Sequence, residues 1–204
     1  PLDQRHLLPA CRLRPLRMEA IVRPELTRVV LTGSESVGKT TLAGQLASHY
    51  GVEFVPEYVR GYAATLDRPL DFRDHGPIAF GQTAREDAYI ARATQLLVQD
   101  TDLLSTVVYC HHYFGRCPAF IEEAAIRRQP SLYLLLDIDV PWVADDVRDR
   151  GDRREEVQSL FVATLQRFSA RYERIAGDWA SRLVSATQAI DALCDTRAIR
   201  TQTE

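Results

Sequence analysis

The chain has 204 residues, of which 46% are hydrophobic and 26% are charged, and its formal net charge at pH 7 is -3. This length suits a single α/β domain, and the composition excludes a disordered, collagen-like or nucleic-acid-coating protein. The longest apolar runs, such as residues 132–136, fall far short of the roughly 20 residues that a membrane-spanning helix needs. We therefore expect neither nucleic acid nor a membrane as a partner.

The four cysteines are scattered along the chain and form no C-x-x-C pair, which is typical of free thiols in a reducing compartment. The charged first segment lacks the continuous apolar stretch of a secretory signal, so we expect a cytoplasmic protein. Residues 1–24 show no apolar period. They are predicted to be a poorly structured N-terminal extension, followed by one domain over residues 25–204.

In chain order, residues 28–32 predict a strand, residues 40–50 a helix that Gly51 stops, and residues 52–56 a second strand. A helix is expected to start at residues 58–66, before a loop over residues 67–77 and a long helix over residues 78–94. A third strand over residues 96–100 and helices over residues 105–113 and 119–128 come next.

Residues 132–138 are apolar on both faces, as a central parallel strand should be. The charged residues 145–172 are predicted to be helical with a break at Gly151, and residues 183–186 to form a last strand before a final helix. Strands that alternate with helices predict an α/β fold with a mostly parallel sheet of about five strands and helices on both faces.

Residues 33–40 read GSESVGKT and match G-x-x-x-x-G-K-[ST] between a predicted strand and a predicted helix, the pattern of a P-loop NTPase. In such a loop, backbone N–H groups face phosphates, the lysine reaches the β- and γ-phosphates, and the Thr hydroxyl binds magnesium. Lys39 is the single lysine among 25 basic residues, which indicates a position where arginine cannot substitute. A glycine turn that only caps a helix is the alternative. The residues expected to bind ATP and Mg²⁺ are Gly33, Ser36, Val37, Gly38, Lys39, Thr40 and Thr41.

Acidic residues follow two of the predicted strands. Asp100 ends the third strand and is the candidate magnesium carboxylate beside Thr40, unless it only caps the next helix. Asp102 is a candidate for contact with the acceptor substrate. Glu57 closes the second strand at the edge where open α/β sheets bind ligands, so it is a candidate base for a substrate hydroxyl; a surface glutamate is the alternative.

Four arginines surround Gly151 within residues 143–156: Arg148, Arg150, Arg153 and Arg154. In a phosphotransferase such a segment can close over the nucleotide and bring an arginine to the transferring phosphate. A solvated helix face is the alternative interpretation.

The motifs of other P-loop classes are missing from the sequence. The chain has no D-x-x-G and no asparagine, so it lacks both GTPase signatures, and the L-S-G-G-Q signature of transporter ATPases is absent. AAA-type motors usually carry an acidic pair after the strand that ends at Asp100, but Thr101 follows here. A compact kinase for a small molecule is favoured.

Four stretches together carry a family resemblance: GSESVGKTT at residues 33–41, EYVR at 57–60, DTD at 100–102 with Thr106 beyond, and DVPWVADD at 139–146 with Arg148. Over residues 27–192 the chain resembles the ribosylnicotinamide kinases, the kinase domain of bacterial NadR proteins. The resemblance implies phosphorylation of the 5′-hydroxyl of nicotinamide riboside by ATP and magnesium, which gives nicotinamide mononucleotide for NAD salvage. It also suggests that the riboside is surrounded by Glu57, Tyr58, Arg60, Asp102, Trp142 and Asp145. The candidate catalytic residues are Lys39 from the phosphate loop, Glu57 as the base and Arg148 from the arginine-rich segment.

Too few residues precede Gly33 for an adenylyltransferase domain or a DNA-binding helix-turn-helix, so we expect a stand-alone kinase domain. Two other functions stay open: a kinase for another nucleoside or small alcohol, and a nucleotide-sensing P-loop ATPase module. Trp142 is also compatible with a core position. The choice between ATP and GTP as the phosphate donor stays open, as does the oligomeric state.

Overall fold

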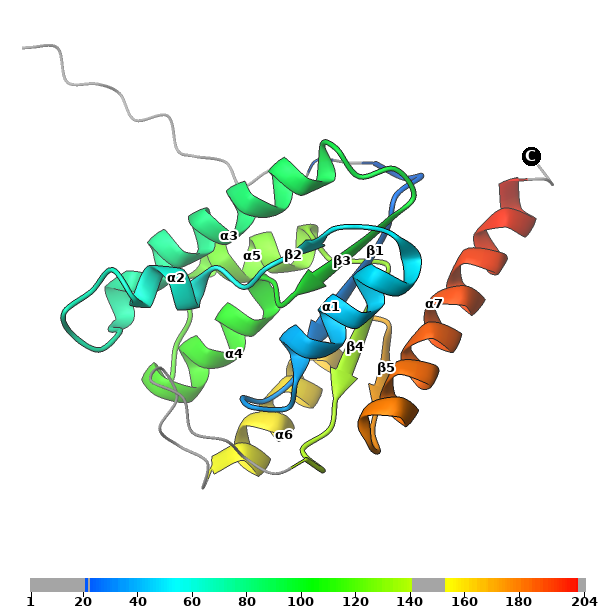
Figure 1. Ribbon diagram of the computed structural model, residues 1–204. Coiled ribbons are helices and arrows are strands. Elements are labelled where there is room, and N and C mark those ends of the chain that lie inside the picture. Colours follow the sequence, from blue (N-terminus) through cyan, green and yellow to red (C-terminus); the bar gives the residue numbers. More distant parts are fainter. Residues whose placement is uncertain (1–20, 22, 141–152, 202–204) are drawn as a thin grey trace, which may run out of the picture.

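A computed structural model of the protein describes residue 21 and residues 23–140 and 153–201 (Figure 1). Its centre is a five-stranded sheet in the order β2-β3-β1-β4-β5, and every neighbouring pair is parallel. This confirms the predicted α/β class and the strand number. The strands are β1 (Thr27–Thr32), β2 (Phe54–Val55), β3 (Leu96–Asp100), β4 (Leu132–Leu136) and β5 (Tyr172–Ile175).

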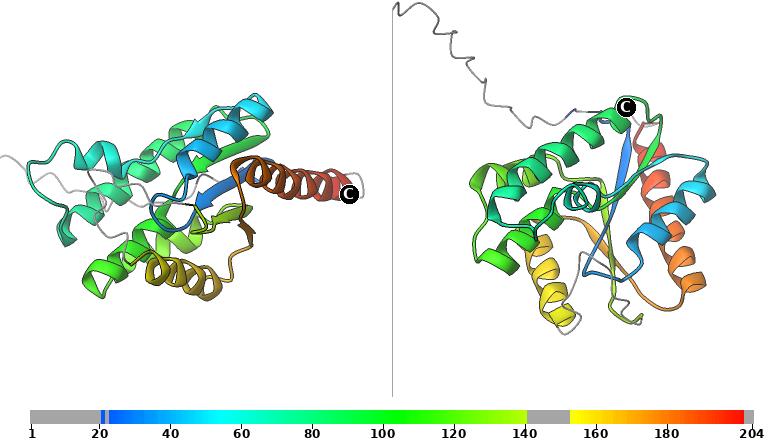
Figure 2. Two further views of the ribbon diagram at one scale, coloured as in Figure 1. Left: turned by 60° about the horizontal axis from the view of Figure 1, so that its bottom comes forward. Right: turned by 60° about the vertical axis from the view of Figure 1, so that its left-hand side comes forward.

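Helices cover both faces of the sheet (Figures 1 and 2). On one face α1 and α7 pack against the strands, and on the other α4, α5 and α6 do so, with α3 beside them over the β2 edge. The helices are α1 (Lys39–Tyr50), α2 (Val59–Ala63), α3 (His75–Ile90), α4 (Leu103–Phe114), α5 (Ala119–Arg127), α6 (Arg154–Arg167) and α7 (Trp179–Thr201), with a short 3₁₀ turn η1 (Phe72–Asp74).

The central strands are apolar on both faces because each face meets a helical layer. In β1, Val29 and Leu31 pack toward α1 and α7, while Val30 packs toward α4 and α5. All five residues of β4 are buried. This arrangement is the physical reason for the unbroken apolar runs in the sequence.

The last strand differs from the sequence-based expectation. Residues 183–186 lie inside helix α7, and the fifth strand is β5, which begins at residue 172, where the predicted helix over residues 145–172 was expected to end. In α7, buried Ala186, Ile190 and Leu193 follow helical spacing and pack against α1, whereas Val184 is exposed. Among the described strands, β5 pairs only with β4, and its two central residues are exposed, so it carries little apolar signal.

The expected loop over residues 67–77 is also partly wrong, because it contains η1 and the first turn of α3. The Asp71 side chain accepts a hydrogen bond from Arg73 N, and Asp74 accepts from Asp71 N, which closes a capping box. Arg68 pairs with Asp74 at 2.8 Å and holds this turn in place.

Strands β1, β2 and β3 end at the same edge of the sheet. Leu31 is in register with both Asp100 on β3 and Leu134 on β4, so the residues that follow these strands come together there. None of the helices in the described part of the chain is long and apolar enough to cross a membrane.

Candidate active site

The loop between β1 and α1 has the backbone that the glycine motif predicts. Gly33 and Gly38 have φ values of 124° and 87°, which side chains rarely tolerate, and Ser36 also has a positive φ of 53°. A Cβ atom at Gly33 would lie 2.7 Å from the carbonyl oxygen of Leu136 on β4. The first glycine of the motif therefore allows the loop to turn directly over the end of the sheet.

Lys39 is the first residue of α1 and is 6% exposed. Its Nζ atom donates hydrogen bonds to the carbonyl oxygens of Ser34 at 2.6 Å and Gly33 at 3.0 Å. The ammonium group thus lies inside the loop, next to the N-terminal end of α1. Both the ammonium charge and the helix N-terminus stabilise an anion at this place.

Thr40 and Asp100 are brought together as the sequence predicted. Thr40 Oγ1 donates a 2.5 Å hydrogen bond to Asp100 Oδ2, and Asp100 is almost fully buried at the end of β3. The alternative of a helix cap applies to another residue, because Asp102 caps α4. Among residues 21, 23–140 and 153–201, no group of three His, Cys, Asp or Glu side chains is placed to hold a metal by itself. A magnesium ion at this pair would take its remaining ligands from phosphate and water oxygens.

A pocket of about 400 Å³ joins the phosphate loop to the end of β2. Glu57 lines it with a side chain that is 10% exposed, and Arg60 Nε lies 3.7 Å from Glu57 Oε2. The pocket is therefore lined by the cationic and amide groups of the phosphate loop, by the Asp100 carboxylate beside Thr40, and by the Glu57–Arg60 pair. The residues that line it are Ser36, Val37, Gly38, Lys39, Thr40, Thr41, Pro56, Glu57, Arg60 and Asp100.

Asp102 lies deeper in the protein. Its Oδ1 accepts a hydrogen bond from Leu104 N at 3.0 Å, and its Oδ2 accepts one from the Tyr133 hydroxyl at 2.7 Å. Burial raises the pKa of Asp102, while the hydrogen bond from Tyr133 lowers it. Both oxygens thus have partners within the protein, and contact with an acceptor stays a prediction.

Two side chains that the sequence analysis missed hold the phosphate loop from helices distant in the chain. Gln158 on α6 accepts from Ser34 N at 3.0 Å and donates to Leu136 O at 2.9 Å. Arg182 on α7 is fully buried and donates to Val37 O at 2.7 Å, to Asp137 O at 3.0 Å and to the Asp139 carboxylate. No motif marks either residue, although a basic residue at a buried position of an amphipathic helix is a weak signal.

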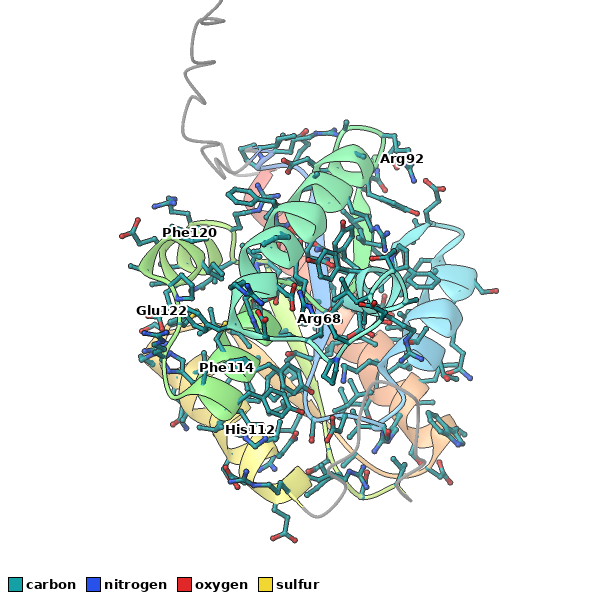
Figure 3. The ribbon with its side chains drawn as sticks, turned by 90° about the vertical axis from the view of Figure 1, so that its left-hand side faces the viewer. Arg68, Arg92, His112, Phe114, Phe120 and Glu122 are labelled. Carbon is teal, nitrogen blue, oxygen red and sulfur yellow. The ribbon has the colours of Figure 1, made fainter. Side chains whose placement is uncertain are left out.

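The arginine-rich segment is described only in part. Arg153 pairs with Glu156 on the surface. Arg154, in contrast, is buried and donates a hydrogen bond to Val140 O at 3.1 Å. Burial lowers the pKa of Arg154, and the negative charge of Glu35 acts in the opposite direction. Helix α6 starts here, and its Glu156 lies 3.4 Å from His112. Figure 3 shows His112 near Phe114 at the end of α4. The predicted site residues Trp142, Asp145 and Arg148 lie outside the described residues.

Aromatic side chains gather at the same end of α4. Phe114 makes edge-to-face contacts with Phe72 and His75, with ring centroids 5.6 Å and 5.2 Å apart. Burial lowers the pKa of His75. This cluster connects the start of α3 with the end of α4 and was not indicated by any sequence motif.

A sequence model of a protein family described as an AAA domain matches residues 28–182. The chain belongs to this AAA-domain family. The match covers the phosphate loop, all five strands and the start of α7. The residue after Asp100 is threonine, whereas AAA-type motors usually carry an acidic pair at this place.

Among curated proteins, this AAA domain is similar to the trifunctional NAD biosynthesis/regulator protein NadR of Escherichia coli (strain K12). The two are 30% identical over 177 residues, which is 83% of this chain and 43% of that protein. The chain therefore spans less than half the length of this relative.

Solved structures give the same fold. A crystal structure of NadR protein in complex with NR matches 84% of this AAA domain and 52% of that chain, with a TM-score of 0.77 and 21% identity. Thymidylate kinase from Ehrlichia chaffeensis matches 82% of this chain and 100% of its own, with a TM-score of 0.55 and 16% identity.

Proposed function

We propose that the chain is a kinase that transfers the γ-phosphoryl group of ATP to the 5′-hydroxyl of nicotinamide riboside and so forms nicotinamide mononucleotide, a step of NAD salvage. The observation that carries the proposal is the pocket in which the phosphate loop faces Glu57 and Arg60. The sequence similarity to NadR, a protein named for NAD biosynthesis, and the NadR structure with NR support nicotinamide riboside as the acceptor.

In this reaction the 5′-oxygen of the acceptor attacks the γ-phosphorus, and the bond from that phosphorus to the β–γ bridging oxygen breaks. ADP leaves with the electron pair of the broken bond. Glu57 takes the proton of the hydroxyl group, because its carboxylate lines the same pocket as the phosphate loop. Lys39 stabilises the charge on the transferring phosphate.

The donor site consists of the phosphate loop, whose positive-φ residues and helix N-terminus suit a triphosphate. Its proposed ATP ligands are Gly33, Ser36, Val37, Gly38, Lys39, Thr40 and Thr41. The Thr40 hydroxyl and the Asp100 carboxylate supply the hard oxygen ligands that Mg²⁺ prefers, so the residues present fit this ion. Bound magnesium neutralises phosphate charge.

On the acceptor side, Glu57, Tyr58 and Arg60 are proposed to contact the riboside from the end of β2, and Asp102 from the start of α4. Trp142 and Asp145 are proposed further riboside ligands, and Arg148 a catalytic arginine. These three assignments rest on the sequence motif alone. Location in the cytoplasm also stays a prediction.

The test is ADP release with magnesium and ATP against a panel of acceptors: nicotinamide riboside, the four ribonucleosides, thymidine, and no acceptor. We expect release that depends chiefly on nicotinamide riboside, with nicotinamide mononucleotide as product. Stimulation by another nucleoside would replace the substrate and keep the kinase. ATP binding without stimulation by any acceptor would instead favour a nucleotide-sensing module.

A further inference from the structure

Helix α3 holds the segment that carries the candidate base. Gln82 Oε1 accepts a hydrogen bond from Tyr58 N at 3.0 Å, and Arg85 Nη1 donates to Glu57 O at 3.0 Å and to Pro56 O at 3.3 Å. Two side chains from adjacent turns of the helix therefore fix the backbone on both sides of Glu57.

The ring of Tyr58 lies directly on the same helix. A Cβ atom at Gly81 would come within 2.0 Å of Tyr58 Cζ, so only glycine leaves room for the ring in this position. The guanidinium carbon of Arg85 lies 4.9 Å from the centroid of that ring, within cation–π range. The Tyr58 ring is thus held between the α3 backbone at Gly81 and the guanidinium group of Arg85, which also donates to Glu57 O.

Gln82 also contacts the chain segment next to Asp100, the proposed magnesium ligand. Its Nε2 lies 3.2 Å from Glu86 Oε1 and 3.5 Å from the carbonyl oxygen of Thr101, the residue after Asp100. Thr101 N in turn donates to Leu31 O on the central strand. Because Glu86 is held in an ion pair with Arg128, the amide of Gln82 has a fixed orientation between two chain segments.

We propose that Gly81, Gln82 and Arg85 are positioning residues for phosphoryl transfer. They fix the position of the Glu57 backbone relative to Asp100 and the phosphate loop. They also place the Tyr58 ring on the acceptor side. The inference rests on the proposed kinase function. Its energetic basis is the steep distance dependence of an oriented reaction, in which a displacement of about 1 Å costs on the order of 100-fold in rate.

The first test is a comparison of Gln82→Met and Arg85→Met with the unmodified chain. Gln82→Met keeps the side-chain length, Arg85→Met keeps only the aliphatic part of a longer side chain, and both remove the hydrogen bonds to the segment around Glu57. We expect kcat with nicotinamide riboside to fall about 10-fold or more, while the KM for ATP changes less than about 2-fold. Unchanged kcat in both folded variants would overturn the proposal.

A double-mutant cycle separates positioning of Glu57 from general damage to the fold. In a Glu57→Gln background, Gln82→Met has no base left to position, so we expect little further loss of kcat. An equal loss in both backgrounds would overturn the proposal. If Gln82→Met does not fold, the cycle is made with Arg85→Met, whose site is only partly buried.

Helix α3 also offers a matched pair of glycine substitutions. Gly81→Ala must displace the Tyr58 ring, whereas the same change at Gly76 would place a Cβ atom 3.8 Å from Phe120, at an ordinary contact distance. We expect the KM for nicotinamide riboside to rise about 10-fold in Gly81→Ala and to stay unchanged in Gly76→Ala. An unchanged KM in both would overturn the placement of the ring.

Acceptor-dependent ADP release by the unmodified chain is measured first in every series. Its absence would overturn the proposed function and this inference together. Normal release by the unmodified chain, combined with unaffected Gln82→Met, Arg85→Met and Gly81→Ala variants, would overturn this inference alone.

Discussion

The Thr40 hydroxyl donates a 2.5 Å hydrogen bond to Asp100, and this contact joins the first turn of α1 to the end of β3 across 60 positions of the sequence. It exists because β1 and β3 are adjacent and parallel, with Leu31 in register with Asp100. The pair would supply two oxygen ligands to a magnesium ion at the point where the phosphate loop enters its helix. The strand order of the sheet therefore determines the proposed magnesium site.

The first prediction concerns this pair. Asp100→Asn keeps the shape of the side chain and removes its charge, so we expect weaker magnesium binding and a loss of kcat/KM of about 100-fold. Thr40→Ser keeps the hydroxyl and serves as the control, with activity close to that of the unmodified chain. Magnesium titrations of ADP release measure both variants. Equal magnesium dependence in Asp100→Asn and the unmodified chain would remove Asp100 from the metal site.

The second prediction is that arginine cannot replace Lys39. The Lys39 side chain is 6% exposed, and its Nζ donates to two loop carbonyl oxygens at 2.6 and 3.0 Å, a compact geometry that a planar guanidinium group does not reproduce. We expect Lys39→Arg, like Lys39→Ala, to lose at least about 100-fold in kcat. Circular dichroism and ADP release are measured together. A Lys39→Arg variant with substantial activity would contradict the point-charge role.

The third prediction concerns Arg182, whose guanidinium joins α7 to the phosphate loop and to the end of β4. Arg182→Met leaves buried carbonyl groups and the Asp139 carboxylate without their donor. We expect a loss of about 3 kcal/mol in the free energy of unfolding and a higher KM for ATP. Urea unfolding of Arg182→Met is compared with that of Arg127→Met, an exposed arginine whose replacement should cost less than about 0.5 kcal/mol.

The fourth prediction is a pH dependence of stability caused by Glu86. Burial and the negative charge of Asp102 raise the pKa of Glu86 from 4.5 to about 7, although Arg128 lowers it. The folded state thus binds more protons than the unfolded state between these values, so the Glu86 contribution is present below pH 4.5 and is lost as the pH rises through 7.

Glu86→Gln mimics the protonated carboxyl group and removes this titration. We expect the difference in unfolding free energy between Glu86→Gln and the unmodified chain to shift in favour of the variant from pH 5 to pH 7.5. Urea unfolding at several pH values measures it. A difference that stays constant over this range would contradict the raised pKa.

The parts of the fold and site that follow from local sequence were predictable. The phosphate loop, α1 and β3 were placed correctly because their signals are a fixed motif and continuous apolar runs. Strand β5 was missed because it is a short edge strand with Glu173 and Arg174 exposed at its centre. Gln158 and Arg182 were missed because each is separated from the phosphate loop by more than 120 positions in the sequence. No local sequence pattern indicates a contact between residues so far apart in the chain.

Folding order is a consequence of the strand arrangement. Strand β1 is the first strand in the sequence, yet its two neighbours in the sheet are β3 and β4, and the loop that follows it is held by Arg182 from the last helix. During synthesis, the phosphate loop thus leaves the ribosome long before the neighbouring strands β3 and β4 and before Gln158 and Arg182. Because such non-local pairing is slow to form, we expect nascent chains to acquire nucleotide binding only when α7 is complete.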